Sequence, residues 1–155
     1  MTSSVSNPAG CNCLALRQAA RHVTQIYDRF LASSGLRATQ YSILARLKRN
    51  GSMTINALAA ELGMDRTTLG RNIRPLRRDG LIEVVRGRSD RRSKELRLTR
   101  DGRTRVRAAF KDWSQAQAQF ESAFGAARAE RLRTLAHEVA LSGVRDEASA
   151  AALQR

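Results

Sequence analysis

The residues between positions 65 and 80 have the types and spacing needed to bind an anion. A helix over this stretch would bury one narrow stripe made of Leu69, Ile73 and Leu76. At about 100° per residue, the opposite face would carry mainly cations and hydroxyls, from Thr67, Arg71, Arg74, Pro75 and Arg78. An exposed helix usually mixes charges of both signs, so this face indicates a polyanionic partner. A solvated basic helix is the alternative interpretation of this segment alone.

Another, shorter helix is expected directly before this basic helix. Residues 54–63 are amphipathic and finish with Gly63, a suitable residue just after a helix end. One residue, Met64, separates Gly63 from Asp65, which is a good N-cap for the second helix. The pair predicts a helix-turn-helix, in which the second helix enters the major groove of DNA. The first turns of that helix hold Arg66, Thr67, Thr68 and Arg71.

A hairpin is expected next. Residues 81–85 and 94–98 read as two short strands. The segment between them, residues 86–93, is too long for a tight turn and includes Arg88, Arg91 and Arg92. A helix-turn-helix followed by a hairpin with a basic tip predicts a winged helix, because a loop of arginines suits the narrow, electronegative minor groove. A disordered basic loop is the alternative.

The charge of the chain agrees with a nucleic-acid partner. The formal net charge is +14, and residues 66–105 hold 14 Lys and Arg against five Asp and Glu. No apolar run approaches the roughly 18 residues that a membrane span needs. Residues 1–10, expected to be mobile, lack the features of a signal peptide. We therefore expect a cytoplasmic protein with Cys11 and Cys13 reduced.

Helices at both ends of the chain carry large apolar faces. They are expected at residues 12–33, 39–49, from Thr99 to an interruption at Gly125, and at 126–141. Packing only against one another would leave much of their apolar surface wet, including Phe110, Trp113 and Phe120. The pattern predicts a mainly α fold with a small β-hairpin wing, whose terminal helices form a homodimer. Residues 11–50 and 99–142 would dimerise, residues 51–98 would bind DNA and residues 143–155 would form a tail. An intramolecular bundle is the alternative.

Two segments carry a family resemblance: LAAELGMDRTTLGRNIRPLRRDGLI at residues 58–82, and SDRRSKELRLTRDG at residues 89–102. With the order of elements, they resemble the MarR family of bacterial transcription regulators over about residues 13–141. The resemblance implies a homodimeric winged helix on a pseudo-palindromic operator, usually a repressor released by a small-molecule effector. It implies that Arg92 enters the minor groove, oriented by Asp90, and that the groove-facing residues of the recognition helix are Thr67, Thr68, Arg71 and Asn72. Pro75 departs from the family pattern and predicts a bend.

The N-terminal segment also resembles the hydroperoxide-sensing branch of that family, in which a cysteine is oxidised and two tyrosines of the partner subunit hydrogen-bond to it. Cys13 and Tyr27 match that pattern, but Ala38 stands where the second tyrosine would be. A buried or inert cysteine is therefore favoured over a peroxide-responsive regulator. A metal site at the two cysteines and His22 would have too few ligands, and no cofactor is expected.

Enzymatic functions find little support. The two histidines, His22 and His137, lie on separate expected helices, and the sequence lacks a Gly-rich phosphate loop and a nucleophile elbow. His22 is expected on a helix surface rather than in a ligand cleft. The prediction is a non-enzymatic, sequence-specific regulator whose partners are double-stranded DNA, a second copy of the chain and an effector. A sequence-tolerant architectural DNA-binding protein is the alternative of another class.

Overall fold

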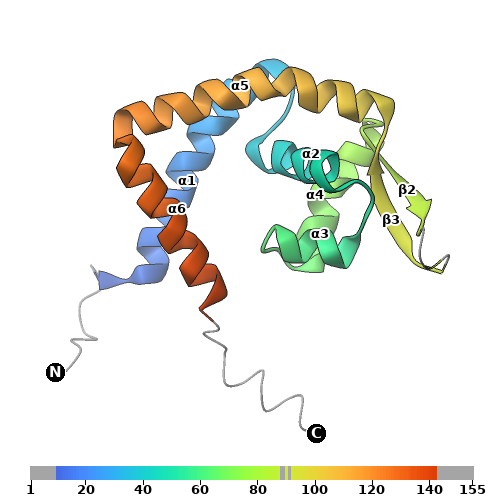
Figure 1. Ribbon diagram of the computed structural model, residues 1–155, viewed down its shortest axis with the longest axis horizontal. Coiled ribbons are helices and arrows are strands. Elements are labelled where there is room, and N and C mark those ends of the chain that lie inside the picture. Colours follow the sequence, from blue (N-terminus) through green and yellow to red (C-terminus); the bar gives the residue numbers. More distant parts are fainter. Residues whose placement is uncertain (1–9, 88–89, 91, 143–155) are drawn as a thin grey trace, which may run out of the picture. The chain divides into compact units, whose positions relative to one another are not determined.

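The computed structural model describes residues 10–87, 90 and 92–142, and the chain divides into two compact units, residues 1–120 and 121–155. The expected mobile N-terminal segment, apart from Gly10, and the tail at 143–155 lie outside the described residues. The elements, drawn in Figure 1, are α1 (Asn12–Leu31), the 3-10 turn η2 (Ala32–Ser34), α2 (Ala38–Asn50), β1 (Met53–Thr54), α3 (Ile55–Glu61), α4 (Arg66–Arg78), β2 (Ile82–Arg86), β3 (Lys94–Leu98), α5 (Arg100–Phe124) and α6 (Ala126–Leu141). The mainly helical fold with a small hairpin is confirmed.

Leucine and isoleucine side chains from α2, α3 and α4 form the centre of the first unit. Those of Ile43, Leu44, Leu58 and Leu69 are wholly inaccessible to solvent. Burying a side chain of this size stabilises the fold by about 1.5–3 kcal/mol. The stripe predicted for α4, Leu69, Ile73 and Leu76, is the one that is buried, so the opposite face of this helix is the one exposed.

The turn between α3 and α4 is fixed by backbone hydrogen bonds. Gly63 has φ +62°, its N–H donates to the carbonyl of Ala60 at 3.2 Å, and the Met64 N–H donates to the carbonyl of Ala59 at 2.9 Å. This pattern closes a helix C-terminus and needs a left-handed residue, for which glycine costs least. Asp65 then caps α4 by accepting the N–H of Thr68 at 2.8 Å. These contacts give the short turn that the sequence predicts.

The sheet has three strands rather than two. In the order β1-β3-β2, all pairs are antiparallel, with Met53 and Val84 on either side of Leu96. The sequence analysis missed β1 because its two residues, Met53 and Thr54, are too few to show an alternating pattern. The third strand ties the base of the hairpin to the start of α3.

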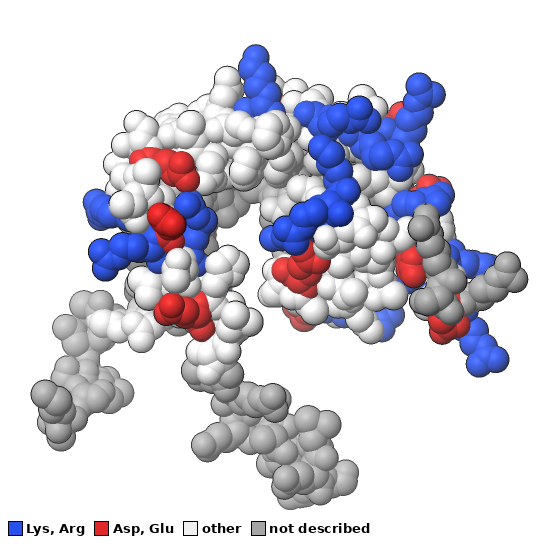
Figure 2. All heavy atoms as spheres, in the orientation of Figure 1, with Lys and Arg blue, Asp and Glu red and all other residues white. Residues whose placement is uncertain are grey.

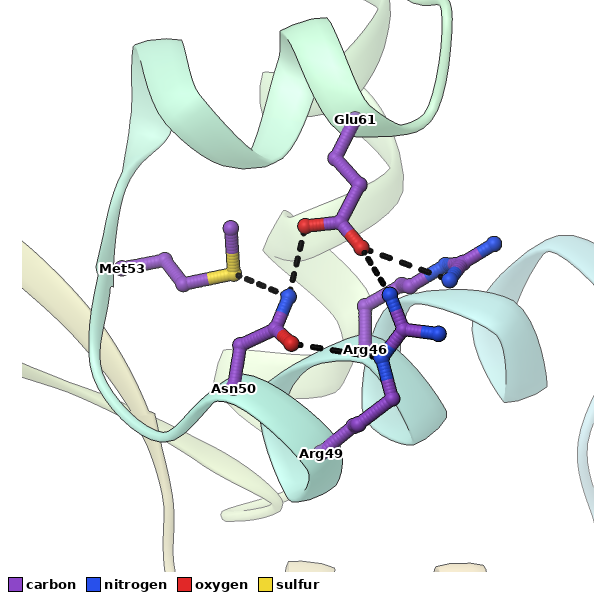
Figure 3. A network of polar contacts seen from close by, with 5 residues as sticks. All are labelled: Arg46, Arg49, Asn50, Met53 and Glu61. Carbon is purple, nitrogen blue, oxygen red and sulfur yellow. Dashed lines mark hydrogen bonds and ion pairs between the residues drawn. The ribbon is translucent and has the colours of Figure 1, made fainter.

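A polar network joins the ends of α2 and α3 (Figure 3). The Glu61 carboxylate accepts hydrogen bonds from Arg49 at 2.8 Å and from the Asn50 amide at 2.6 Å. Arg46 pairs with the same carboxylate at 3.3 Å. A single acid therefore engages both arginines and fixes the spacing of the two helices.

The side of α5 that packs on the core is lined mainly by small residues. Its buried residues are Gly102, Val106, Ala109 and Ala116, whereas 55% of Phe110 is exposed. Small residues allow the helix axis to approach the core closely, and a phenylalanine would prevent this. The expectation that Phe110 and Trp113 share one outward apolar face is only partly right. Trp113 is half-buried and stacks on Tyr41, with ring centroids 6.0 Å apart.

One expected boundary changes. The first α-helix ends at Leu31 rather than at residue 33, because the backbone tightens into η2. Helix α4 contains Pro75 and continues through it to Arg78. No helix in the described ranges has the length and apolar character to cross a membrane.

Candidate nucleic-acid interface

An open groove of about 960 Å³ runs between the exposed face of α4 and the β2–β3 hairpin. Four of the predicted contact residues line it together: Arg66, Thr67, Arg71 and Arg74. Its other lining residues are Ile55, Gly70, Ile73, Arg77, Arg78, Val84, Lys94, Glu95 and Leu96. The two walls come from segments that the core and the third strand hold in place, so the cationic side chains are displayed on a rigid support.

Two other predicted contact residues on α4 do not line the groove. The Thr68 hydroxyl donates to the Asp65 carboxylate at 2.6 Å. The Asn72 amide donates to the backbone carbonyl of Thr68 at 2.9 Å. Both side chains are engaged with their own helix, which the sequence pattern could not reveal.

The arginines of the groove differ in how they are paired. Arg78 pairs with Asp79 at 3.0 Å. By contrast, Arg66, Arg71, Arg74 and Arg77 form no ion pair with any carboxylate in the described part of the chain. On the face drawn in Figure 2, basic side chains also extend along the hairpin and over the first turns of α5. The groove is therefore a cationic surface whose charge is left largely uncompensated.

The N-cap of α4 is held ionised. Hydrogen bonds from the hydroxyl and the backbone N–H of Thr68 hold the pKa of Asp65 below its usual value. A lowered pKa means that the capping contribution is present above the unfolded-state pKa and is lost as the pH falls through the folded-state value. The capping contribution of Asp65 is therefore lost only in acid.

The tip of the hairpin is organised by Asp90. Its carboxylate accepts the N–H of Arg92 at 2.8 Å, and its carbonyl accepts the N–H of Ser93 at 3.0 Å. Gly87 closes the other side by donating its N–H to the Ser93 carbonyl at 2.9 Å. Arg92 is exposed. Two further predicted contact residues, Arg88 and Arg91, lie outside the described residues.

The cysteines at the start of α1 are both exposed. Cys11 is the N-cap, and its sulfur accepts the N–H of Leu14 at 3.4 Å. Of the two expectations for Cys13, a buried or an inert cysteine, the first is wrong, since the first turns of α1 are exposed. The Tyr27 hydroxyl donates to the Gln117 side chain of the same chain. Among the described residues, no group of three or more His, Cys, Asp or Glu could hold a metal ion.

The sequence analysis did not predict several residues that line the groove, among them Gly70, Arg77 and Lys94. Arg77 lies three residues after Arg74, and this spacing could have placed it on the same face. Lys94 was treated only as the first residue of a strand. Gly70 carries no side chain that a pattern of charge or hydropathy could register.

The chain is similar in sequence and structure to known transcription regulators. The model of the MarR family matches residues 36–94. The HTH-type transcriptional regulator PetP of Rhodobacter capsulatus is 31% identical over 104 residues, which cover 60% of this chain and 63% of PetP. The transcriptional regulator MosR of M. tuberculosis, solved in complex with DNA, is 39% identical with a TM-score of 0.76, and the match covers 85% of this chain and 95% of MosR. MarR of E. coli, 18% identical with a TM-score of 0.66 over 83% of this chain and 96% of that one, shares the fold.

The helix-turn-helix, the hairpin and the basic groove between them define a winged-helix protein. With MosR matched over nearly its whole length, this chain belongs to the MarR family of transcriptional regulators.

Proposed function

We propose that this protein is a cytoplasmic, non-enzymatic transcription regulator that binds a pseudo-palindromic operator as a homodimer. The observation that carries the proposal is the groove beside α4, in which four arginines lack a described ion-pair partner. Guanidinium groups bind phosphates, and they also donate two hydrogen bonds to guanine in the major groove. The complex of MosR with DNA supports the same partner for this chain.

Exposed apolar side chains support the homodimer. Leu16 of α1, Phe110 of α5 and Leu135 of α6 are each about half exposed, at 49%, 55% and 56%. A second copy would cover such faces and would present two recognition helices, one to each half of a dyad. Trp113 and Phe120, expected in the dimer, are half-buried in the single chain, so they could contribute only their outer edges.

A second hollow on the surface is a candidate site for a small-molecule effector. This hollow of about 630 Å³ is lined by residues of α1, α2 and α4 and of the turns beside them, including Arg29, Arg37 and Arg78 together with Asp28 and Asp79. A small anion bound there would contact the C-terminal end of α4 directly and could release the operator. His22 lies in a separate shallow hollow whose other lining residues are also on α1. Oxidation at Cys13, which is exposed, stays the alternative signal.

The proposal predicts a steep dependence of DNA binding on salt. A dimer that neutralises about eight phosphates should give a slope near −7 when the logarithm of the association constant is plotted against that of the salt concentration, because bound counterions are released. Fluorescence anisotropy with a labelled duplex between about 50 and 200 mM salt measures this slope. A slope close to −2 would contradict docking by two winged helices.

Two arginines of α4 should make different kinds of contact. Arg71 lies in the first half of the helix, where side chains reach base edges, and it has no described ion-pair partner. Arg71→Ala should therefore cost about 1–3 kcal/mol on the preferred duplex and relax the sequence preference. Arg78, at the far end and paired with Asp79, should touch phosphate. Arg78→Ala is the matched control and should weaken binding to all duplexes by the same factor. If both variants lose the same affinity for preferred and for random DNA, this assignment of the two arginines is excluded.

A further inference from the structure

Gly70 is half-buried on the side of α4 that lines the groove, where no contact in the described part of the chain requires a glycine. Its φ is not among the positive values found at other glycines, so its helical backbone is open to any residue. A Cβ atom placed there would meet no atom within 4 Å. Alanine is more stable than glycine inside a helix, because glycine loses more conformational freedom on folding. The glycine therefore weakens α4 without improving any described contact of the fold.

The surroundings of Gly70 point to a reason outside the chain. It lines the cationic groove. Arg66 and Thr67 precede it by four and three residues and Arg74 follows it by four, so these three flank it on the same helix face. The long side chains thus surround a spot where the helix backbone is bare. A bare backbone allows another molecule to approach more closely than any side chain would permit.

We propose that Gly70 is the point at which the base edges of the DNA come closest to α4, and that its missing side chain decides which bases fit there. The inference rests on the proposed function, in which α4 occupies the major groove. Base edges in that groove project different groups, including amines, carbonyl oxygens and the thymine methyl. A methyl group at position 70 would occupy the space of such a group, and α4 would be held away from the bases that its arginines must reach.

The test separates the stability of the helix from its fit to DNA. The full-length wild-type protein first selects its preferred duplex from a random library, and a random duplex of the same length serves as the second probe. Gly70→Ala should raise the midpoint of thermal unfolding by roughly 2 °C or more, because alanine favours the helix. It should weaken binding to the selected duplex by about tenfold or more, as expected when a base contact is lost. Binding to the random duplex should change less than about twofold, since phosphate contacts remain.

Thr104→Ala is the matched control, because it also places alanine at an exposed helical position, on α5 and away from the residues that line the groove. It should leave both affinities unchanged. The inference is overturned if Gly70→Ala binds the selected duplex as tightly as the wild type, or if its affinity for both duplexes falls by the same factor. A lower midpoint of thermal unfolding would also overturn it. A wild-type protein that selects no preferred duplex would instead defeat the proposed function, and the role of Gly70 with it.

Discussion

Leu135→Asp combined with Val139→Asp is expected to convert the proposed homodimer to a monomer. The two side chains lie one turn apart on α6, and 56% of each is exposed, so the change leaves the described core intact. Two carboxylates on an apolar interface would have to lose their hydration without gaining partners. Sedimentation should show monomers. Because two linked recognition helices bind far more tightly than one, affinity for the operator should fall by about 100- to 10,000-fold.

His137→Asp provides the control for this experiment. Position 137 is also exposed, but it lies about 200° around the helix from Leu135. The variant should stay dimeric and bind DNA nearly as well as the wild type. Trp113 would be a poorer choice for the test, because its stacking on Tyr41 makes it part of the core of the single chain. A double variant that sediments as a dimer would show that the interface lies elsewhere.

Gly102→Ala is expected to cause the largest loss of stability among single-methyl changes on α5. A Cβ atom at this position would lie 2.0 Å from the backbone carbonyl oxygen of Leu81, so the helix would have to move away from the hairpin. That movement would strain the hydrogen bond from the Thr99 N–H to the Leu81 carbonyl, now 3.1 Å, and the one from the Thr99 hydroxyl to the Gly80 carbonyl, now 2.6 Å. Overpacking of this kind typically costs about 1–3 kcal/mol and occasionally more.

Urea unfolding measures the effect of Gly102→Ala, which should appear as a lower midpoint with an unchanged slope. Gly70→Ala makes the same chemical change at a site with open space, so it should not lower the midpoint. If both variants unfold at the wild-type midpoint, the close packing of α5 on the start of β2 is not a feature of the folded protein.

The sequence predicts α4 well because two signals coincide there. Asp65 marks where the helix begins, and Leu69, Ile73 and Leu76 mark the buried side, which leaves the arginines on the other. Local capping and helical periodicity are properties of a short segment, so they can be read without knowing the rest of the fold. The hairpin of β2 and β3 can be predicted for the same reason, since turn residues bound its two strands.

The parts that sequence analysis missed depend on distant segments. The strand β1 exists only because Met53 and Thr54 find β3 some 40 residues later. On α5, the buried stripe uses Ala109 and Ala116 rather than Phe110, because the close approach to the core selects small side chains. Hydropathy alone favours the phenylalanine. Likewise, no local pattern shows that the Thr68 hydroxyl donates a hydrogen bond to the Asp65 carboxylate, whereas Thr67 lines the groove.

The central claim is that the groove beside α4 reads a specific DNA sequence, and footprinting tests it most directly. Genomic fragments that the full-length protein retains are sequenced, and one retained promoter fragment and one random fragment are then cleaved in its presence. We expect protection of a discrete dyad whose half-sites lie about one helical turn apart, roughly 10–10.5 base pairs or a multiple of it, on the promoter fragment only. Equal, continuous protection of both fragments would contradict the account and would identify a sequence-tolerant DNA-binding protein instead.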